Sequence, residues 1–278
     1  MVALLYVSTP RYRLGLPRGS YAAGALRWWC EAGRGSDVHR CRRTRHCRSS
    51  ADREICLAVG VRRAAPPRGP ELPARLERGK SAALSHDASF TETELTGASL
   101  VDQHARGLTF ETAKLAGVDL SGSRLEHLRI VDAVLDGCNL ANVQGRGARL
   151  SRVVVKDSRL TGIDLSEGVL TDVTFQGCRV DLASFSSRRL ERVTFEDCVL
   201  AQTDFLEARL DSVGFHGCDL TNADLRGARL ERCELRRSDL TGLQGVASLR
   251  GAAMEWPDIV EMAGVWATAL GIEVLDSD

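Results

Sequence analysis

The chain has 278 residues, enough for one or two domains, and a formal net charge of zero. No apolar run approaches the roughly 18 residues of a membrane-spanning helix, and the first residues lack the pattern of a signal peptide, so we expect neither kind of segment. We therefore expect a cytoplasmic protein without a membrane partner, whose nine cysteines are reduced.

The first 80 residues differ in charge from the rest of the chain. They contain 17 Lys and Arg but 6 Asp and Glu, whereas residues 81–278 contain 20 and 31. The segment is rich in arginine without an apolar period, so we expect a basic leader that is disordered or translated from DNA upstream of the true protein. A basic arm for nucleic acid is one alternative. The other is a zinc site at Cys41, Cys47, Cys56, His39 and His46, although no Cys-x-x-Cys pair occurs there.

From about residue 86 a large apolar residue recurs at every fifth position, with a small residue two positions before it. Phe90, Leu95 and Leu100 begin the large series, and Ala98 belongs to the small one. A period of five is neither the 3.6 of a helix nor the 2.0 of a strand, so the chain must turn a corner every five residues.

The large residue is missing at three places. Ala105, Gly145 and Gly245 occupy its position, and they fall on one side because they differ by multiples of twenty. We expect a bulge or bend at residues 141–150 and the end of the regular pattern at Gly245.

The quintets TGASL, AGVDL, HGCDL, TNADL and RGARL resemble the motif of pentapeptide-repeat proteins. The resemblance implies an all-β fold for residues 81–250. In that fold, a right-handed quadrilateral parallel β-helix (solenoid), four quintets form the four sides of a coil. Residues 81–250 then form about eight 20-residue coils, followed by a C-terminal capping α-helix.

Stacked coils place each residue over the one twenty positions earlier, about 4.8 Å away. The inward columns are expected to form core ladders. These ladders comprise Phe175, Phe195 and Phe215, with Val173, Val193 and Val213 beside them, and Cys178, Cys198 and Cys218. We interpret the cysteines as small buried residues rather than as a redox or metal site.

One outward column carries an arginine row, with carboxylates two residues further along each coil. This candidate partner surface comprises Arg129, Arg149, Arg189, Arg209, Arg229, Glu191, Asp211 and Glu231. The simplest expectation is a solvated face whose opposite charges pair, each pair contributing little. Short acidic columns, Asp164 with Asp204 and Asp224 and also Asp219 with Asp239, lie on other sides.

Residues 251–278 form the C-terminal segment. Pro257 suits a first helical turn, Gly271 suits a helix end, and the apolar spacing between them predicts one amphipathic helix of about fourteen residues. Its apolar face comprises Ile259, Met262, Trp266 and Leu270. This face either covers the last coil as a lid or joins two copies in a homodimer, as in relatives of the family.

The sequence contains no nucleophile elbow, phosphate loop or metal-spaced histidine pair, so we expect neither an enzyme nor a cofactor. The main expectation is a protein-interaction scaffold with an unknown protein partner and no direct nucleic-acid binding by the rod. The resemblance adds an alternative. The family's best-understood members mimic duplex DNA, bind type II topoisomerases such as DNA gyrase, and protect them from quinolones.

Overall fold

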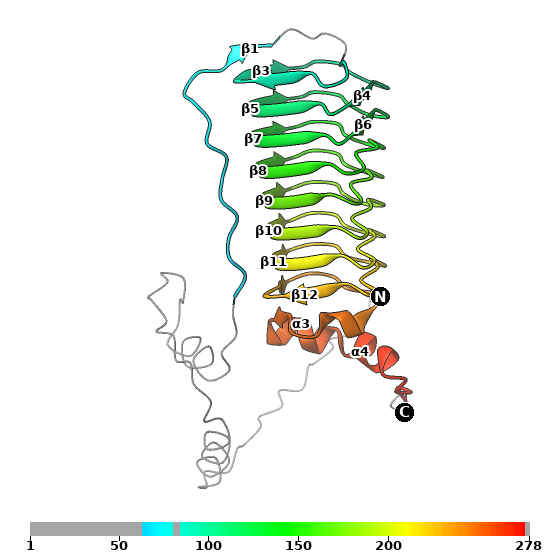
Figure 1. The fold of residues 1–278 in the computed structure, drawn as a ribbon. Helices are drawn as coiled ribbons and strands as arrows, with labels where there is room; N and C mark the ends of the chain where they lie inside the picture. Colours follow the sequence, from blue (N-terminus) through cyan, green and yellow to red (C-terminus); the bar gives the residue numbers. More distant parts are fainter. Residues whose placement is uncertain (1–62, 80–83, 276–278) are drawn as a thin grey trace, which may run out of the picture. The chain divides into compact units, whose positions relative to one another are not determined.

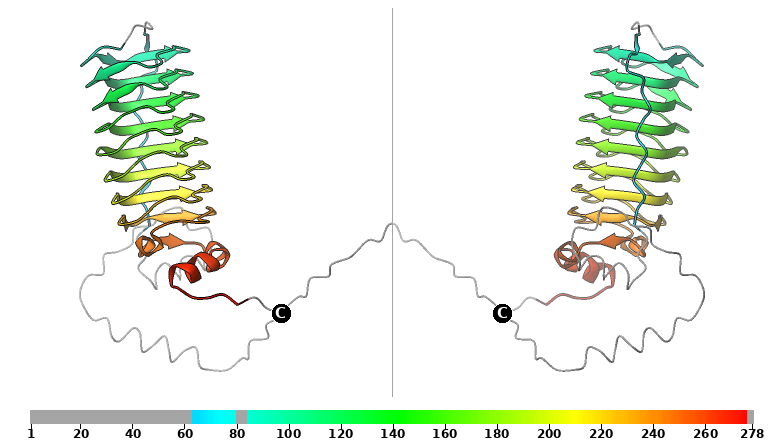
Figure 2. Two further views of the ribbon diagram at one scale, coloured as in Figure 1. Left: turned by 90° about the vertical axis from the view of Figure 1, so that its right-hand side faces the viewer. Right: turned by 90° about the vertical axis from the view of Figure 1, so that its left-hand side faces the viewer.

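The computed structural model describes residues 63–79 and 84–275. All of them belong to one compact unit, Ile55–Asp278. Within this unit the chain winds into a parallel β-solenoid, called the rod below, with short helices at its C-terminal end (Figures 1 and 2). The zinc site and the nucleic-acid arm considered for the leader lie at residues outside this description.

Six strands of eight residues form the main sheet, and each begins twenty residues after the one before it. They are β5 (Thr109–Ala116), β7 (Arg129–Asp136), β8 (Arg149–Lys156), β9 (Val169–Gln176), β10 (Arg189–Glu196) and β11 (Arg209–His216). Neighbours pair in parallel with a register of twenty residues, as between Arg189 and Arg209. This register confirms the predicted coil length.

Shorter strands continue the main sheet at both ends. They are β1 (Glu77–Arg78), β2 (Ser89–Thr91), β3 (Thr93–Thr96), β12 (Arg229–Glu231), β13 (Glu234–Arg236) and β14 (Ala253–Met254). On another side of the coil, β4 (His104–Arg106) pairs with β6 (Arg124–Glu126), and single bridges continue that ladder along the rod.

A left-handed corner residue explains the period of five. Every fifth residue from Asp87 to Gly242 has a positive φ. The long strands contain such a corner as well, for example Asp172 (φ 56°) within β9, so each long strand covers two sides of the coil. Glycine, aspartate and asparagine tolerate this conformation best, and they occupy many of the corners.

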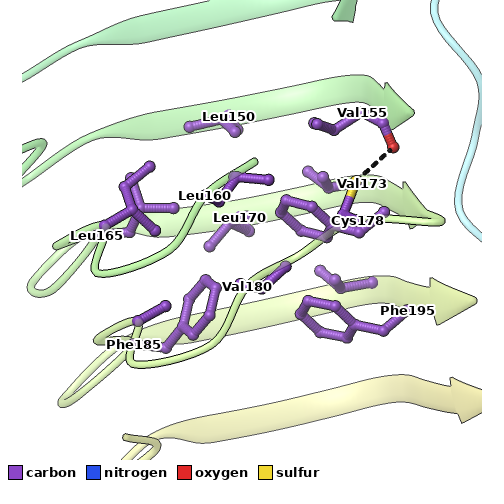
Figure 3. Packing of buried hydrophobic residues seen from close by; sticks show 14 of the residues in the cluster. Leu150, Val155, Leu160, Leu165, Leu170, Val173, Cys178, Val180, Phe185 and Phe195 are labelled. Atoms are coloured by element: carbon purple, nitrogen blue, oxygen red, sulfur yellow. Dashed lines mark hydrogen bonds between the residues drawn. The ribbon is translucent and has the colours of Figure 1, made fainter. Parts of the chain in front are cut away.

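Two aromatic stacks fill the core of the central coils. Phe195 lies between Phe175 and Phe215, with ring centroids 4.8 and 5.2 Å apart, as the sequence predicts. A second stack, Phe185 on Phe205 at 5.2 Å, meets the first edge-on, and its contact was not predicted (Figure 3). Both arrangements are favourable for aromatic rings, so the stacks stabilise one packing of the core.

The cysteine ladder is buried and bonded to the backbone. Cys178 Sγ donates a hydrogen bond to the carbonyl of Val155, one coil earlier, at 3.4 Å (Figure 3). At the same position of another quintet, Thr203 Oγ1 donates to the carbonyl of Val180 at 3.0 Å. This inward position therefore suits a small side chain that carries a hydrogen-bond donor, either a weak thiol or a stronger hydroxyl. Burial also raises the pKa of the Cys218 thiol to about 11, which keeps it protonated at neutral pH.

The bend expected at residues 141–150 is absent. Gln144 bridges to Arg124 on one side and to Asp164 on the other, and Gly145 N donates to Asp164 O at 2.8 Å. The ladder continues because these bonds use only the backbone, which a missing inward side chain does not change. At Gly245, by contrast, the regular pattern ends as predicted and the 3-10 helix η1 (Val246–Leu249) begins.

The C-terminal segment forms two short helices, not the single one predicted. Helix α3 (Trp256–Glu261) and helix α4 (Ala263–Ala269) meet at Met262, whose φ and ψ of −88° and 8° interrupt the helix. This interruption accompanies burial of the Met262 side chain, which is 5% exposed against the core. Gly271, with φ 69°, ends α4 as expected.

Residues 63–79 depart from the expectation of an unpacked leader that reaches residue 80. Strand β1 pairs in parallel with β3, and the preceding residues run along the rod (Figure 1). Their backbone N–H groups donate hydrogen bonds to the side-chain carboxylates of Asp132, Asp172 and Glu234. Four prolines hold this stretch extended, so it packs without an apolar period of its own.

Candidate functional site

The arginine row is exposed along the rod. Arg129, Arg149, Arg189 and Arg209 are the first residues of β7, β8, β10 and β11, and Arg229 is the first residue of β12. The parallel ladder holds the members in direct register, one coil or about 4.8 Å apart, except across Val169, where Arg149 and Arg189 are two coils apart. Arg129, Arg149, Arg189 and Arg209 project from strands that are paired on both sides, whereas the strand of Arg229 is paired with β11 on one side. Most of the row is therefore a preorganised strip of positive charge.

The flanking carboxylates do not neutralise this row as expected. Arg189 Nη2 lies 3.3 Å from Glu191 Oε2, but Glu191 also accepts a hydrogen bond from Arg192. Asp211 is bonded by Arg232, and Glu231 lies 3.9 Å from the same guanidinium. Among the residues that the structure describes, Arg189 is the only row member with an ion pair.

A second charged column lies at the coil corner three residues after the arginine row. This corner column contains Asp132, Arg152, Asp172 and Arg192, which form ion pairs with one another. Asp132 accepts a bond from Arg152 Nε at 2.6 Å, and Asp172 accepts one from Arg192 Nε at 2.7 Å. These arginines hold the pKa of both carboxyls below the ordinary range. The pairs are vertical, between consecutive coils, because the corner positions stack in register. The sequence analysis did not identify them.

Arg188 is buried inside the rod at a position where other coils have alanine or leucine. Its side chain is 1% exposed, and Nη2 donates to the carbonyl of Ala148, two coils away, at 2.9 Å. The neighbouring coil has Gly168 at this position, where a Cβ would lie 2.6 Å from Arg188 Nη1. The absent side chain therefore makes the space for the guanidinium.

This burial has a visible cost. Nε and Nη1 of Arg188 have no hydrogen-bond partner, and burial lowers its pKa to about 9. The adjacent ladder is stretched, since Arg189 N lies 3.4 Å from Gly168 O, whereas Arg209 N lies 2.7 Å from Arg188 O. The available sequence signal, which the sequence analysis did not use, is a single arginine in a column that otherwise contains alanine, glycine and leucine.

A shallow hollow interrupts the arginine row. Its volume is about 440 Å³, and Arg149, Val169 and Gly168 form part of its lining. Val169 stands where the row lacks an arginine and is 36% exposed. Arg146 and Glu167 form an ion pair at its rim. The strip therefore has one apolar position, Val169, beside a hollow in which half of the lining residues are charged, including Glu126 and Glu167.

The regular quintets match two family models. One, described as a pentapeptide repeat region, covers residues 169–244. The other, described as pentapeptide repeats in eight copies, covers residues 88–127, 129–166 and 148–186. The chain belongs to the pentapeptide-repeat family. This membership confirms the resemblance found in the sequence, and the coils make up a repeat scaffold.

Similar solved structures include other pentapeptide-repeat proteins. HetL, involved in heterocyst differentiation regulation in the cyanobacterium Nostoc sp. strain PCC 7120, is 20% identical with a TM-score of 0.28, over 62% of this chain and 91% of HetL. A trypsin-treated variant of QnrB1, a plasmid-mediated fluoroquinolone resistance protein, is 18% identical with a TM-score of 0.34, over 69% and 98%. Rfr23 from the cyanobacterium Cyanothece 51142 is 23% identical, with a TM-score of 0.18, over 39% and 60%. No curated protein sequence matches the chain.

The acidic columns of this pentapeptide-repeat rod are short and locally engaged. Bridges align Asp204 with Asp224, as predicted, but Ser184 and Gln244 continue the same column. Asp224 pairs with Arg226 at 2.6 Å. Asp219, on another side, accepts bonds from the backbone and hydroxyl of Thr221. These carboxylates stabilise turns within their own coils, so the described surface has a mixed charge pattern.

The predicted apolar residues of the C-terminal segment separate into two groups. Met262 is buried, and Trp266 packs partly against the core. Leu270 is 75% exposed, as is Trp256, and Ile259 is half-buried. The side chain of Asp258 accepts a bond from Arg237 N at 2.9 Å, which attaches α3 to the last coil. One face of the segment thus covers the rod and another faces solvent.

The described residues contain no group of three or more His, Cys, Asp and Glu side chains that could hold a metal ion. His216 is largely buried, and burial lowers the pKa of its imidazole. No helix in the described part of the chain has the length and apolar content needed to span a membrane.

Proposed function

We propose that the protein is a non-enzymatic interaction scaffold and that its arginine row binds an acidic surface of a protein partner. The observation that carries this proposal is the row itself, which is exposed, in register and largely unpaired. An exposed arginine that lacks a partner loses no ion pair when it binds a carboxylate. Bidentate contacts from a planar guanidinium also give specificity as well as affinity.

The rigid spacing of the row favours an extended acidic partner. The guanidinium groups of Arg129, Arg149, Arg189 and Arg209 start from strands that are paired on both sides, so little backbone freedom is lost on binding. Val169 replaces arginine between Arg149 and Arg189, so a partner can place one apolar side chain against it between two charged contacts.

Charge reversal tests the proposal with a matched control. The full chain serves as bait in affinity capture from its source cells, beside Arg209→Glu with Arg229→Glu. The control, Arg159→Glu with Arg179→Glu, makes the same charge change on exposed positions of another side. We expect a partner that wild type and control retain and the row variant loses. Equal retention by all three chains would contradict the proposal.

The alternative function is DNA mimicry directed at a type II topoisomerase. A fluoroquinolone resistance protein among the similar structures motivates this test. A mimic requires dense negative charge, because duplex DNA carries one charge per about 1.7 Å. The arginine row and the short acidic columns favour the acidic-partner proposal instead. DNA gyrase supercoiling assays with a quinolone, with and without the purified chain, distinguish the two, since protection of the enzyme would favour mimicry.

A further inference from the structure

Residues 63–79, called the strap below, run along the side of the rod that carries the corner column. Strand β1 attaches its C-terminal end to β3. Before this strand the rod holds the strap by backbone N–H groups. Ala64 N donates to Glu234 Oε1 at 3.2 Å, Arg68 N to Asp172 Oδ1 at 3.1 Å, and Glu71 N to Asp132 Oδ1 at 3.2 Å. Figure 1 shows the strap crossing successive coils beside the long strands.

The distance between two of these donors along a polyproline II helix matches the distance between their acceptors along the solenoid. Arg68 and Glu71 are three residues apart, one turn of polyproline II, which rises about 9.3 Å. Their acceptors, Asp172 and Asp132, are two coils apart, about 9.6 Å. Between Arg68 and Glu71, one turn of the strap therefore spans two coils and brings an N–H back to the corner column. Ala64, four residues before Arg68, instead reaches Glu234, two positions after the corner Arg232.

The strap sequence supports this geometry. Pro67, Pro70 and Pro73 recur at every third position, and the first two directly precede the bonded residues Arg68 and Glu71. Ala64, Pro67 and Pro70 are half-buried, which places every third residue of this stretch against the rod. Gly69 is exposed, and a Cβ there would contact nothing within 4 Å.

Arginines of the rod hold the two acceptor carboxylates in place independently of the strap. Asp172 is bonded by Arg192 through both oxygens, at 2.7 and 3.0 Å, and Asp132 is bonded by Arg152. Each carboxylate keeps lone pairs that face the strap, and the N–H groups use them. Because the arginines hold the carboxylates in place, recognition depends on the period of the N–H groups more than on strap side chains.

We propose that the corner column is a binding groove for extended proline-rich segments with an N–H on every third residue, and that the strap is its resident ligand. A segment of another protein with the pattern Pro-x-x-Pro-x-x-Pro has the same chemistry and competes with the strap. The corner column and the arginine row are different columns, although Glu191 contacts both Arg189 and Arg192. The strap is described on the corner column itself, so this inference does not depend on the proposed partner of the row.

A labelled peptide with the sequence of residues 63–76 tests the groove by fluorescence anisotropy on the full chain. In one variant, Arg68→Pro with Glu71→Pro removes the two N–H donors but keeps the polyproline II preference. The matched control, Arg68→Ala with Glu71→Ala, keeps the donors and loses only the side chains. We expect the peptide to bind the proline variant at least tenfold more tightly than wild type or the alanine control, whose grooves stay occupied.

The peptide itself provides the second comparison. A peptide carrying the same two proline substitutions should lose at least tenfold in affinity for the proline variant, whereas the alanine peptide should bind like the parent. Asp132→Asn with Asp172→Asn, added to the proline variant, should weaken binding by a similar factor. Equal binding of the parent peptide to wild type and proline variant would overturn the proposal, as would the absence of binding to a variant with an unchanged thermal melt.

Hydrogen exchange on the wild-type chain keeps the proposal testable if the proline variant does not fold. The amides of Arg68 and Glu71 should be protected, and excess parent peptide should increase their exchange, whereas the proline peptide should not. Exchange of both amides at the rate of an unstructured chain, without any peptide, would overturn the assignment of the strap as ligand.

Discussion

Individual residues at two positions of each quintet decide how well a coil closes. The corner residue must accept a positive φ, which is easy for Gly137 but strained for Leu182, with φ 58° and a side chain 57% exposed. The small inward residue sets the space beside the central one. At this scale, departures from the motif appear as local strain, and Arg188 is the clearest case.

The first prediction concerns the aromatic stack. Phe195→Ala should lower the free energy of unfolding by about 3–5 kcal/mol, because it opens a cavity between Phe175 and Phe215. The exposed control Arg209→Ala should stay within about 0.5 kcal/mol. Arg192 is outward too but is unsuitable as the control, because its removal would leave Asp172 without its ion pair. Denaturant unfolding measures both variants beside the wild-type chain, and equal costs for Phe195→Ala and Arg209→Ala would contradict the inward assignment.

The second prediction concerns the buried arginine. Arg188→Leu should raise the free energy of unfolding by about 1–4 kcal/mol, because an apolar residue replaces a buried, incompletely bonded charge. Leu108 and Leu128 already occupy the same position in other coils, so the shape is tolerated. The neighbouring Arg189→Leu is the matched control and should show no such gain. A lower melting temperature for Arg188→Leu would mean that the guanidinium stabilises the rod.

At the scale of elements, the described structure combines three kinds of segment with different sources of stability. The long strands are stabilised by inward ladders and by their neighbours in register. Helices α3 and α4 are too short to be stable alone, so they depend on contacts such as Met262 on the core. The strap depends on ionised carboxylates, which makes its attachment sensitive to pH.

The third prediction follows from the carboxylates under the strap. The pKa values of Asp132 and Asp172 are lower in the folded chain than the ordinary 3.8, first because of Arg152 and Arg192 and also because of the strap amides. Their contribution to stability is therefore complete above the ordinary value and is lost as the pH falls through the lower folded values.

Hydrogen exchange at decreasing pH measures this effect. Below about pH 3.8, the protection of the Arg68 and Glu71 amides, corrected for intrinsic rates, should fall before that of the long strands. Asp132→Asn with Asp172→Asn should remove the pH dependence. Simultaneous loss of protection in the strap and in β10 would show that the strap does not titrate separately.

For the whole molecule, the C-terminal end of the rod determines how copies could associate. Met262 and Trp266 face the rod, whereas Trp256, Val260 and Leu270 are 75%, 57% and 75% exposed. Exposed apolar side chains that lie near one another commonly mark an interface. We propose a homodimer joined through this outer face, and a monomer with a capped end is the alternative.

Sedimentation provides the fourth prediction. The wild-type full chain should be a dimer at tens of micromolar, and Trp256→Glu with Leu270→Glu should make it a monomer without lowering the melting temperature of the rod. Trp266→Glu should instead destabilise the cap, because this side chain packs partly against the core. A monomeric wild-type chain at the same concentration would contradict the dimer.

Much of the rod follows from the sequence by itself. Period five, the twenty-residue coil and the Phe175, Phe195 and Phe215 ladder could be predicted because every coil repeats the same contacts with its neighbour. Residues that are twenty positions apart then lie in the same column and have similar environments. The arginine row could be identified in the same way, since its members share one column.

Only the tertiary structure decided the contacts that do not repeat. Arg192 pairs with Asp172 as well as with Glu191. Arg188 turns inward because Gly168 leaves space, and the strap lies on the corner column. These contacts depend on where long arginine side chains point and on how the strap, which has no five-residue repeat, packs against the repeating surface of the rod. The sequence pattern does not specify either of these, because both arise only when the coils are stacked in three dimensions.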